Sequence, residues 1–314
     1  MAISRRAIVL AAGAVLLALV PPVAGLLNQP FYVDLFRRMM IFAIAALSLD
    51  LILGYGGMVS FGHAAYLGIG AYAVGIFAFY GVDNGFLQWS VAIAASAAAA
   101  LVIGVISIRT SGVYFIMITL AFTQMLYYLG ISLETYGGDN GMPLKTRSQF
   151  AGLVDLRNPS AFYYVVLALL LLFLVLGRRL VAARFGMVIR SARSNEPRAR
   201  AIGFSPFRYK LAAFVLAGGA CGLAGALLAN QTEYLTPDFM HWTRSGEIMF
   251  MVILGGMRTL FGPVLGAVVL LGLEDVLSAW TTHWQMILGP ILLLVVLFAK
   301  RGLVGWLPER GRDG

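Results

Sequence analysis

Charged residues are scarce in this chain. Asp, Glu, Lys and Arg make up 12% of its 314 residues, whereas 60% are hydrophobic. A soluble domain is about a quarter charged and about half apolar, so this composition excludes an ordinary water-soluble fold and indicates a membrane protein. Cysteine is nearly absent too: with Cys221 alone, neither an internal disulfide nor a cysteine metal cluster can form. Cys221 lies among small apolar residues and is predicted to be a small buried side chain.

The motifs of common catalytic and nucleotide sites are also missing. The sequence has no G-x-x-x-x-G-K-[ST] and therefore no P-loop for ATP. It also lacks H-E-x-x-H, C-x-x-C and G-x-S-x-G. Its three histidines, His63, His241 and His283, are far apart, which argues against a metal site. We therefore expect no catalytic residues, no metal, no cofactor and no enzymatic activity.

What the chain does have is a series of long apolar runs. They do not alternate as the strands of a membrane barrel would, so they predict helices. The predicted fold is an all-α polytopic membrane bundle of about ten transmembrane helices, forming one domain over residues 1–314. The short eighth run and the glycine-rich third run are candidates for broken or re-entrant helices. The ten predicted spans are residues 7–27, 39–54, 60–80, 87–108, 112–130, 161–177, 211–229, 246–255, 261–280 and 286–299.

The distribution of basic residues predicts the topology. If the spans alternate from a cytoplasmic N-terminus, 17 of the 23 Lys and Arg residues fall inside and 6 outside. This asymmetry favours two cytoplasmic termini and explains the net charge of +9 without nucleic-acid binding. Arg37 and Arg38, on the outer side, do not fit this pattern. The first run could be a signal peptide cleaved after the small residues 23–25, but its length favours a retained anchor.

The segment from Arg178 to Lys210 is the most basic part of the chain. It holds nine basic residues and a single acid, Glu196. A short helix is predicted from about Glu196 to Ile202, because Asn195 can cap its start, Pro197 suits the first turn and Gly203 suits the end. The segment either sets orientation only or, as we favour, presents this helix to a partner.

Glycine crowds the segment Gly54–Tyr72. Its glycines either allow close helix packing or let the backbone unwind along a path. Within it, His63 is a candidate proton relay or substrate contact, although an interior hydrogen-bonding role is favoured. Asp50, inside an apolar run, is expected to be a helix-end or helix-joining residue rather than a functional one. Glu247 is read as an ordinary acid at a helix start.

Two further segments are less informative. The outer loop, at about residues 131–160, balances its charges and contains an Asp-Asn-Gly turn, which indicates a structured cap that can serve as a docking surface for a partner outside. GGMVSFG at Gly56 and GGMRTLFG at Gly255 resemble each other weakly and are one residue out of register. That match alone does not establish an internal duplication.

Five blocks carry a resemblance that covers most of the chain. They are GYGGMVSFGHAAYLGIGAY at Gly54, TLAFTQMLYYL at Thr119, GGDNGM at Gly137, RFGMVIRSARSNEPRARAIGFSPFRYKLAAF at Arg184 and HWTRSGEIMFMVILGGMRTLFGPVLGA at His241. With these blocks the chain closely resembles the permease subunits of branched-chain amino acid ABC importers, of the LivM type.

The resemblance implies a heteromeric importer in the bacterial inner membrane. Its partners would be a LivH-like second permease, two cytoplasmic ATPase subunits that bind the ATP, and a periplasmic substrate-binding protein. The stretch EPRARAIG lies where such permeases carry the helix that docks into the ATPase, although it departs from a strict E-A-A spelling. The ATPase-coupling residues implied are Glu196, Arg198, Ala199, Ile202 and Gly203.

The translocation path and the substrate are less well defined. Relatives of this group carry branched-chain amino acids, and also other amino acids, amides and urea. A permease for urea or short amides is therefore an alternative. A self-sufficient secondary transporter, with Asp50, Glu247 and His63 carrying coupling ions, is a further alternative. The residues predicted to line the path are Gly57, Ser60, His63, Gly68, Gly255 and Gly256.

Overall fold

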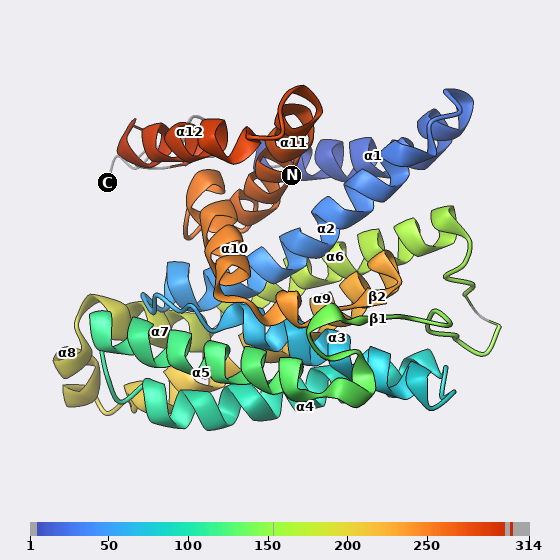
Figure 1. Ribbon diagram of the computed structural model, residues 1–314. Helices are drawn as coiled ribbons and strands as arrows, with labels where there is room; N and C mark the ends of the chain where they lie inside the picture. The colour runs from blue at the N-terminus through green and yellow to red at the C-terminus, as the bar shows by residue number, and fades with distance from the viewer. Residues whose placement is uncertain (1–4, 153, 299–301, 304–314) are drawn as a thin grey trace.

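The computed structural model describes residues 5–152, 154–298 and 302–303, and long helices dominate it (Figure 1). The all-α class is confirmed, and each of the ten predicted runs corresponds to one long helix. Among the described residues, α4, α5, α6, α9 and α11 are both long and apolar enough to cross a membrane, so ten crossings stays a prediction. The long helices are α1 (Arg5–Leu26), α2 (Pro30–Asp50), α3 (His63–Phe79), α4 (Gly85–Ser107), α5 (Val113–Ser132), α6 (Pro159–Ala182), α9 (Pro206–Thr232), α10 (Trp242–Gly255), α11 (Gly262–Trp280) and α12 (Trp284–Phe298).

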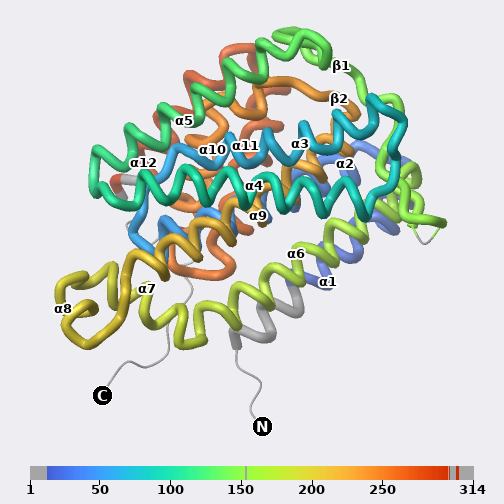
Figure 2. Tube along the Cα trace, turned by 90° about the horizontal axis from the view of Figure 1, so that it is seen from below, coloured from blue at the N-terminus to red at the C-terminus, as the bar shows by residue number. Residues whose placement is uncertain are grey.

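Helix α9 lies at the centre and packs against both α3 and α4 (Figure 2). In its most apolar stretch 72% of the residues are buried, against 33% or less in α4, α5, α6 and α11. Glycine makes this close packing possible: a Cβ atom at Gly225 would overlap the carbonyl oxygen of Leu67, and one at Gly70 would overlap that of Gly222. The two backbones therefore touch directly, as small residues allow in membrane helices.

Helix α2 connects this core to the remaining helices. It packs against α9 on one side and against α10, α11, α6 and α1 on others. Helix α1 is held against α6 as well, because the Tyr163 hydroxyl donates to the carbonyl of Leu17 at 2.7 Å and the Tyr164 hydroxyl donates to that of Ala18 at 3.2 Å. The first apolar run is thus an integral part of the described helical bundle.

Large apolar side chains are exposed on the outward faces of the peripheral helices. Water would not tolerate an apolar surface of this extent on a monomer, whereas lipid tails would cover it without cost. The exposed residues include Leu101, Val102 and Ile106 on α4, Tyr114, Met117 and Met125 on α5, and Leu172, Val175 and Leu176 on α6.

Two regions relate to the predicted broken or re-entrant runs: the chain is irregular before α3, although α3 itself is continuous, and α10 is short. After α2 the chain forms one π-helical turn, η1 (Leu51–Tyr55), and then runs without helix until α3 begins at His63. Helix α10 has 14 residues and begins at Trp242, four residues before the predicted start of that run. At 1.5 Å per residue it is about 21 Å long, too short for a hydrocarbon core of about 30 Å.

Short elements join the segment before α6 to the segment after α9. The 3-10 turns η2 (Glu134–Tyr136) and η3 (Gly138–Asn140) lead to the two-residue strand β1 (Met142–Pro143), which pairs antiparallel with β2 (Tyr234–Leu235). A further turn, η4 (Pro237–Met240), leads into α10. The Arg147 guanidinium lies 2.6 Å from the Glu233 carboxylate, which adds an ion pair to this connection.

The structure accounts for the two arginines that the charge rule left unexplained. Arg37 is only 2% exposed, and its guanidinium donates to the side chains of Gln231 and Asp34 and lies 4.6 Å from the centre of the Phe162 ring. Arg38 lies 3.5 Å from the carboxylate of Glu274. Both charges are therefore matched by groups of the same chain.

Candidate functional site

Two short helices connect α6 to α9: α7 (Arg184–Ser194) and α8 (Glu196–Ala201). The sequence determines the limits of α8. The Asn195 side chain accepts a hydrogen bond from the backbone N–H of Arg198 at 2.9 Å, and Pro197 occupies the first turn. Gly203 ends the helix with φ +89°, a conformation that favours glycine. The predicted short helix is thus present, ending one residue before the predicted Ile202.

Polar contacts join α8 to the start of α9. The Glu196 carboxylate accepts from the Lys210 ammonium at 2.5 Å and from the Arg200 guanidinium at 2.6 Å. The hydrogen bond from Lys210, and then the one from Arg200, hold the pKa of Glu196 below its usual value, although partial burial opposes them. Ala199, within α8, is fully buried. These contacts fix the orientation of α8 on the bundle.

The opposite side of α8 is exposed. Arg198 and Gly203 lie at the surface, Ile202 is 63% exposed and Phe204 is 41% exposed. Of the five predicted coupling residues, only Ala199 is buried. Apolar and basic side chains that stay largely exposed in the described chain provide a surface suited to a groove on another protein.

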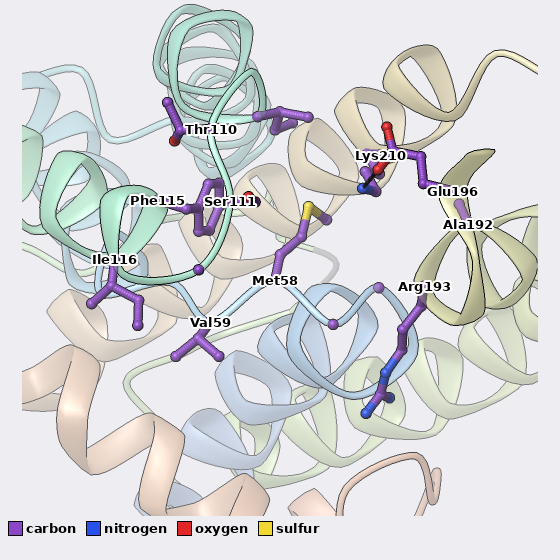
Figure 3. A pocket seen from close by; sticks show the side chains of 14 residues that line it. Met58, Val59, Thr110, Ser111, Phe115, Ile116, Ala192, Arg193, Glu196 and Lys210 are labelled. Atoms are coloured by element: carbon purple, nitrogen blue, oxygen red, sulfur yellow. Dashed lines mark hydrogen bonds and ion pairs between the residues drawn. The ribbon is translucent and has the colours of Figure 1, made fainter. Parts of the chain in front are cut away.

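A cavity of about 290 Å³ lies between α7–α8, the turn that joins α4 to α5, and the glycine-rich segment after η1 (Figure 3). Glu196 and Lys210 close it on one side, while Thr110 and Phe115 line the other. Gly56, Gly57 and Arg193 also line it. Helix α8 and one of the predicted path glycines therefore border the same space.

The other predicted path residues of the third run lie deeper. The Ser60 hydroxyl is buried and accepts from the backbone N–H of Gly62 at 3.0 Å. His63 is fully buried at the start of α3, with its ring edge-on to Tyr66 at 5.7 Å. Among the described residues, neither ring nitrogen of His63 has a hydrogen-bond partner. The favoured interior hydrogen-bonding role of this histidine is therefore not supported.

The three remaining path glycines lie where neighbouring segments come close or where the chain turns. They are Gly68, Gly255 and Gly256. A Cβ atom at Gly68 would collide with the side chain of Met240, and one at Gly255 would collide with the backbone of Gly262. Gly256 ends α10 with φ +115°. In the described chain these residues do not share one cavity with Gly57, so a common path through all six stays a prediction.

The remaining ionisable candidates have structural partners. Asp50 ends α2, is 2% exposed and accepts from the backbone N–H of Arg258 at 3.0 Å, as expected for a helix-end residue. Glu247 lies in the first turns of α10 and pairs with Arg244 at 2.8 Å. Cys221 is fully buried, as predicted. No group of three potential metal ligands occurs among the described residues.

One functional candidate was missed at the level of sequence. Arg193, in the last turn of α7, donates from its guanidinium to the carbonyl oxygen of Gly54. In the sequence Arg193 is one of nine basic residues in a basic segment, and nothing in that pattern distinguishes it from its neighbours. A cation near a helix end is a weak signal, because the partner carbonyl lies 139 residues away in the chain.

A bundle of long apolar helices that expose apolar side chains outward is typical of a multi-pass membrane protein. The chain belongs to the family described as branched-chain amino acid transport system / permease component, whose model matches residues 31–297. The resemblance seen in the sequence is thereby confirmed.

Individual relatives agree with the family match. The high-affinity branched-chain amino acid transport system permease proteins LivM of Salmonella typhimurium and Escherichia coli are each 28% identical over 298 residues, covering 87% of this chain and 69% of theirs. The probable branched-chain amino acid transport permease protein LivM of Methanocaldococcus jannaschii is 24% identical, covering 86% of this chain and 91% of its own. No solved structure matches the chain.

Proposed function

We propose that this chain is the membrane-spanning permease subunit of an ABC importer that moves branched-chain amino acids, or similar small amino acids, from periplasm to cytoplasm. The observation that carries the proposal is the family match over residues 31–297. The capped helix α8, with its exposed apolar and basic face, supports it as the element through which ATP-driven motion reaches the helices.

The energy source in this proposal is a pair of separate ABC ATPase subunits. The sequence has no P-loop, so ATP would act on partner chains. Arg198, Ile202 and Gly203 would contact the ATPase directly. Glu196 and Ala199 would hold α8 in place through Lys210 and the bundle. A LivH-like second permease and a periplasmic binding protein complete the assembly.

The proposed location is the bacterial inner membrane, with both termini and the α7–α8 segment in the cytoplasm. The excess of basic residues on that side supports this orientation. The contacts of α1 with Tyr163 and Tyr164 support a retained first helix. We further propose that residues 1–314 act as one transmembrane domain, with 131–160 as its outer loop and 178–210 as its inner coupling loop.

The proposed path for the solute involves Gly57, Ser60, His63, Gly68, Gly255 and Gly256. Gly57 supports it most directly, because it borders the 290 Å³ cavity beside the coupling helix. Ser60 and His63 follow on the interrupted segment that leads into α3. Irregular backbone at membrane depth is tolerated where it is buried in protein or lines a cavity.

Reconstitution tests the proposal. The chain, co-purified with the ATPase and second permease chains of its own organism, is placed in liposomes with binding protein outside and ATP inside. We expect ATP-dependent uptake of labelled leucine, isoleucine or valine. Uptake of urea instead would favour the amide alternative. Solute movement by this chain alone under a proton or sodium gradient would favour a secondary transporter and contradict the proposal.

Substitutions in α8 test the coupling role separately. Ile202→Asp and Gly203→Asp should abolish uptake while the protein still reaches the membrane, because each places a charge on the face offered to the ATPase. Residue 203 also has a positive φ, so an aspartate there is strained. Gly152→Asp is a matched control, since Gly152 also has a positive φ (+79°) and open space around it but lies in the outer loop. Unchanged uptake in both α8 variants would count against the docking role.

A further inference from the structure

The chain contains two Gly-Gly-Met turns, at residues 56–58 and 255–257. In each turn the second glycine has a positive φ, +70° at Gly57 and +115° at Gly256. Each turn also follows a helix and precedes another, since α2 and η1 lead to α3, and α10 leads to α11. Only glycine adopts such backbone angles freely, so the two turns share a glycine with positive φ at the same position of the repeated letters.

Hydrogen bonds join the segment just before the first turn to Arg258, the residue that follows the second turn. The Asp50 carboxylate accepts from the backbone N–H of Arg258 at 3.0 Å, and the Tyr55 hydroxyl donates to its carbonyl at 3.0 Å. Arg258 itself has φ +67°, which is unfavourable for a residue with a side chain and requires such contacts to hold it. A Cβ atom at Gly54 would come within 2.9 Å of the Arg258 nitrogen.

Arg193 brings the α7–α8 segment into this junction. Its guanidinium donates to the carbonyl of Gly54, one of the last carbonyls of the α2–η1 helix, which have no partner within their own helix. Its aliphatic stem covers Gly57, where a Cβ atom would lie 2.8 Å from the Arg193 Cγ. Figure 3 shows the Arg193 side chain extending away from the Glu196–Lys210 pair.

Nearby charges act on this contact in both directions. Arg193 lies within electrostatic range of Arg258, which repels it, and of Asp50, which attracts it less strongly. A cation at a helix C-terminus also interacts favourably with the helix dipole. Arg193 is two residues before Asn195, the residue that caps α8, so a displacement of α8 is transmitted to Arg193 through one peptide segment.

We propose that Arg193 is the positioning residue that couples the docking helix to the paired Gly-Gly-Met turns. When α8 moves, Arg193 moves the carbonyl of Gly54, and the bonds of Asp50 and Tyr55 carry that displacement to Arg258 and so to α10 and α11. One side chain thus links the coupling segment to both interrupted regions of the membrane bundle. This inference rests on the proposed function, because it requires an ATPase that moves α8.

The test compares solute uptake with ATP hydrolysis in the reconstituted importer, with labelled leucine as the solute, or urea if the wild type carries that. For Arg193→Ala we expect ATP hydrolysis within two-fold of wild type and at least a ten-fold lower uptake per ATP. Arg193→Lys should recover part of the uptake, since it keeps the charge but has one donor group instead of a planar fork. Arg184→Ala removes an exposed arginine from the same helix and should leave the uptake per ATP hydrolysed unchanged.

The outcomes separate this inference from the proposed function. If the wild-type complex shows no ATP-driven uptake, the proposed function fails. If the wild type transports and both Arg193 variants keep its uptake per ATP, only the inference fails. A parallel loss of hydrolysis and uptake would assign Arg193 to subunit assembly and also overturn it. Should Arg193→Ala not assemble, Arg193→Lys provides the test, with an expected uptake per ATP several-fold below wild type.

Discussion

The α9-centred core and the adjoining α7–α8 segment are neighbours in the chain but are held together in different ways. In the core, α9 touches α3 backbone to backbone through Gly225 and Gly70. The α7–α8 segment has a small buried face, and its described ties to other elements include the polar contacts of Arg193 and Glu196. Contacts between backbones cannot be rearranged without separating two helices, whereas a polar side chain can follow a displaced partner.

This difference indicates which parts of the molecule can move during transport. The core of α3, α4 and α9 behaves as one rigid unit because close-packed interiors resist continuous deformation. We expect the α7–α8 segment to shift more readily, because polar side chains make part of its contacts. Four experiments test this comparison, from the largest expected effect to the smallest.

The first test concerns the core. Gly225→Ala should destabilise the protein by about 3 kcal/mol or more, because the added methyl group overlaps the Leu67 carbonyl and forces α9 away from α3. Gly219→Ala, on the same helix, is the matched control: its Cβ atom would meet its nearest neighbour at 3.4 Å, an ordinary contact. That substitution should leave the free energy of unfolding unchanged or raise it by up to about 1 kcal/mol, because alanine has the higher helix propensity. Thermal unfolding in detergent measures both, and equal melting midpoints would contradict the account.

The second test compares adjacent arginines on α2. Arg37→Ala should lower the free energy of unfolding by roughly 2–4 kcal/mol, because it removes a large buried side chain and leaves the Gln231 side chain without this hydrogen bond. Arg38→Ala should cost less than about 1 kcal/mol, since its side chain is 40% exposed and its ion pair with Glu274 is long. The same unfolding assay distinguishes them. An equal loss for both would show that burial of Arg37 contributes little.

The sequence alone predicted much of the helical fold. Hydrophobic runs located the ten long helices, and the Asn195, Pro197 and Gly203 pattern located α8, because both signals depend only on residues close in the chain. The Arg193 contact could not be predicted, since Gly54 is 139 residues away and only the fold brings them together. For the same reason the distribution of basic residues could not explain Arg37, because its partner Gln231 is 194 residues away in the chain.

The third test concerns the cap of α8. Asn195→Ala removes the side chain that accepts from the Arg198 N–H and should destabilise this helix by about 1 kcal/mol. Hydrogen exchange at the Arg198 amide should then be roughly five-fold faster, while amides of α9 are unaffected. Asn195→Asp keeps an acceptor at the same place and should retain protection. An equal rise in exchange throughout the bundle would mean that α8 is not an independent unit.

The fourth test uses pH. Because hydrogen bonds from Lys210 and Arg200 lower the pKa of Glu196 in the folded protein, its ionised form stabilises α8 above its unfolded pKa of about 4.3. That stabilisation is lost as pH falls through the lower folded pKa. The difference in melting midpoint between wild type and Glu196→Gln should therefore be constant from about pH 8 to pH 5 and decrease as pH falls below about 4.3. The difference is small because the Glu196 side chain is 32% exposed. A difference that grows on acidification would contradict this account.

The buried Arg37 has a consequence for biosynthesis. In the proposed topology this guanidinium must cross to the outer side while the ribosome is still far from Gln231, the acceptor it finally meets. Asp34, one helical turn earlier, is the counterion already available to the nascent chain. The translocon therefore handles a locally neutralised pair, and the lasting arrangement forms only once α9 has been made. Losing Asp34 should thus impair insertion more than it impairs the finished protein.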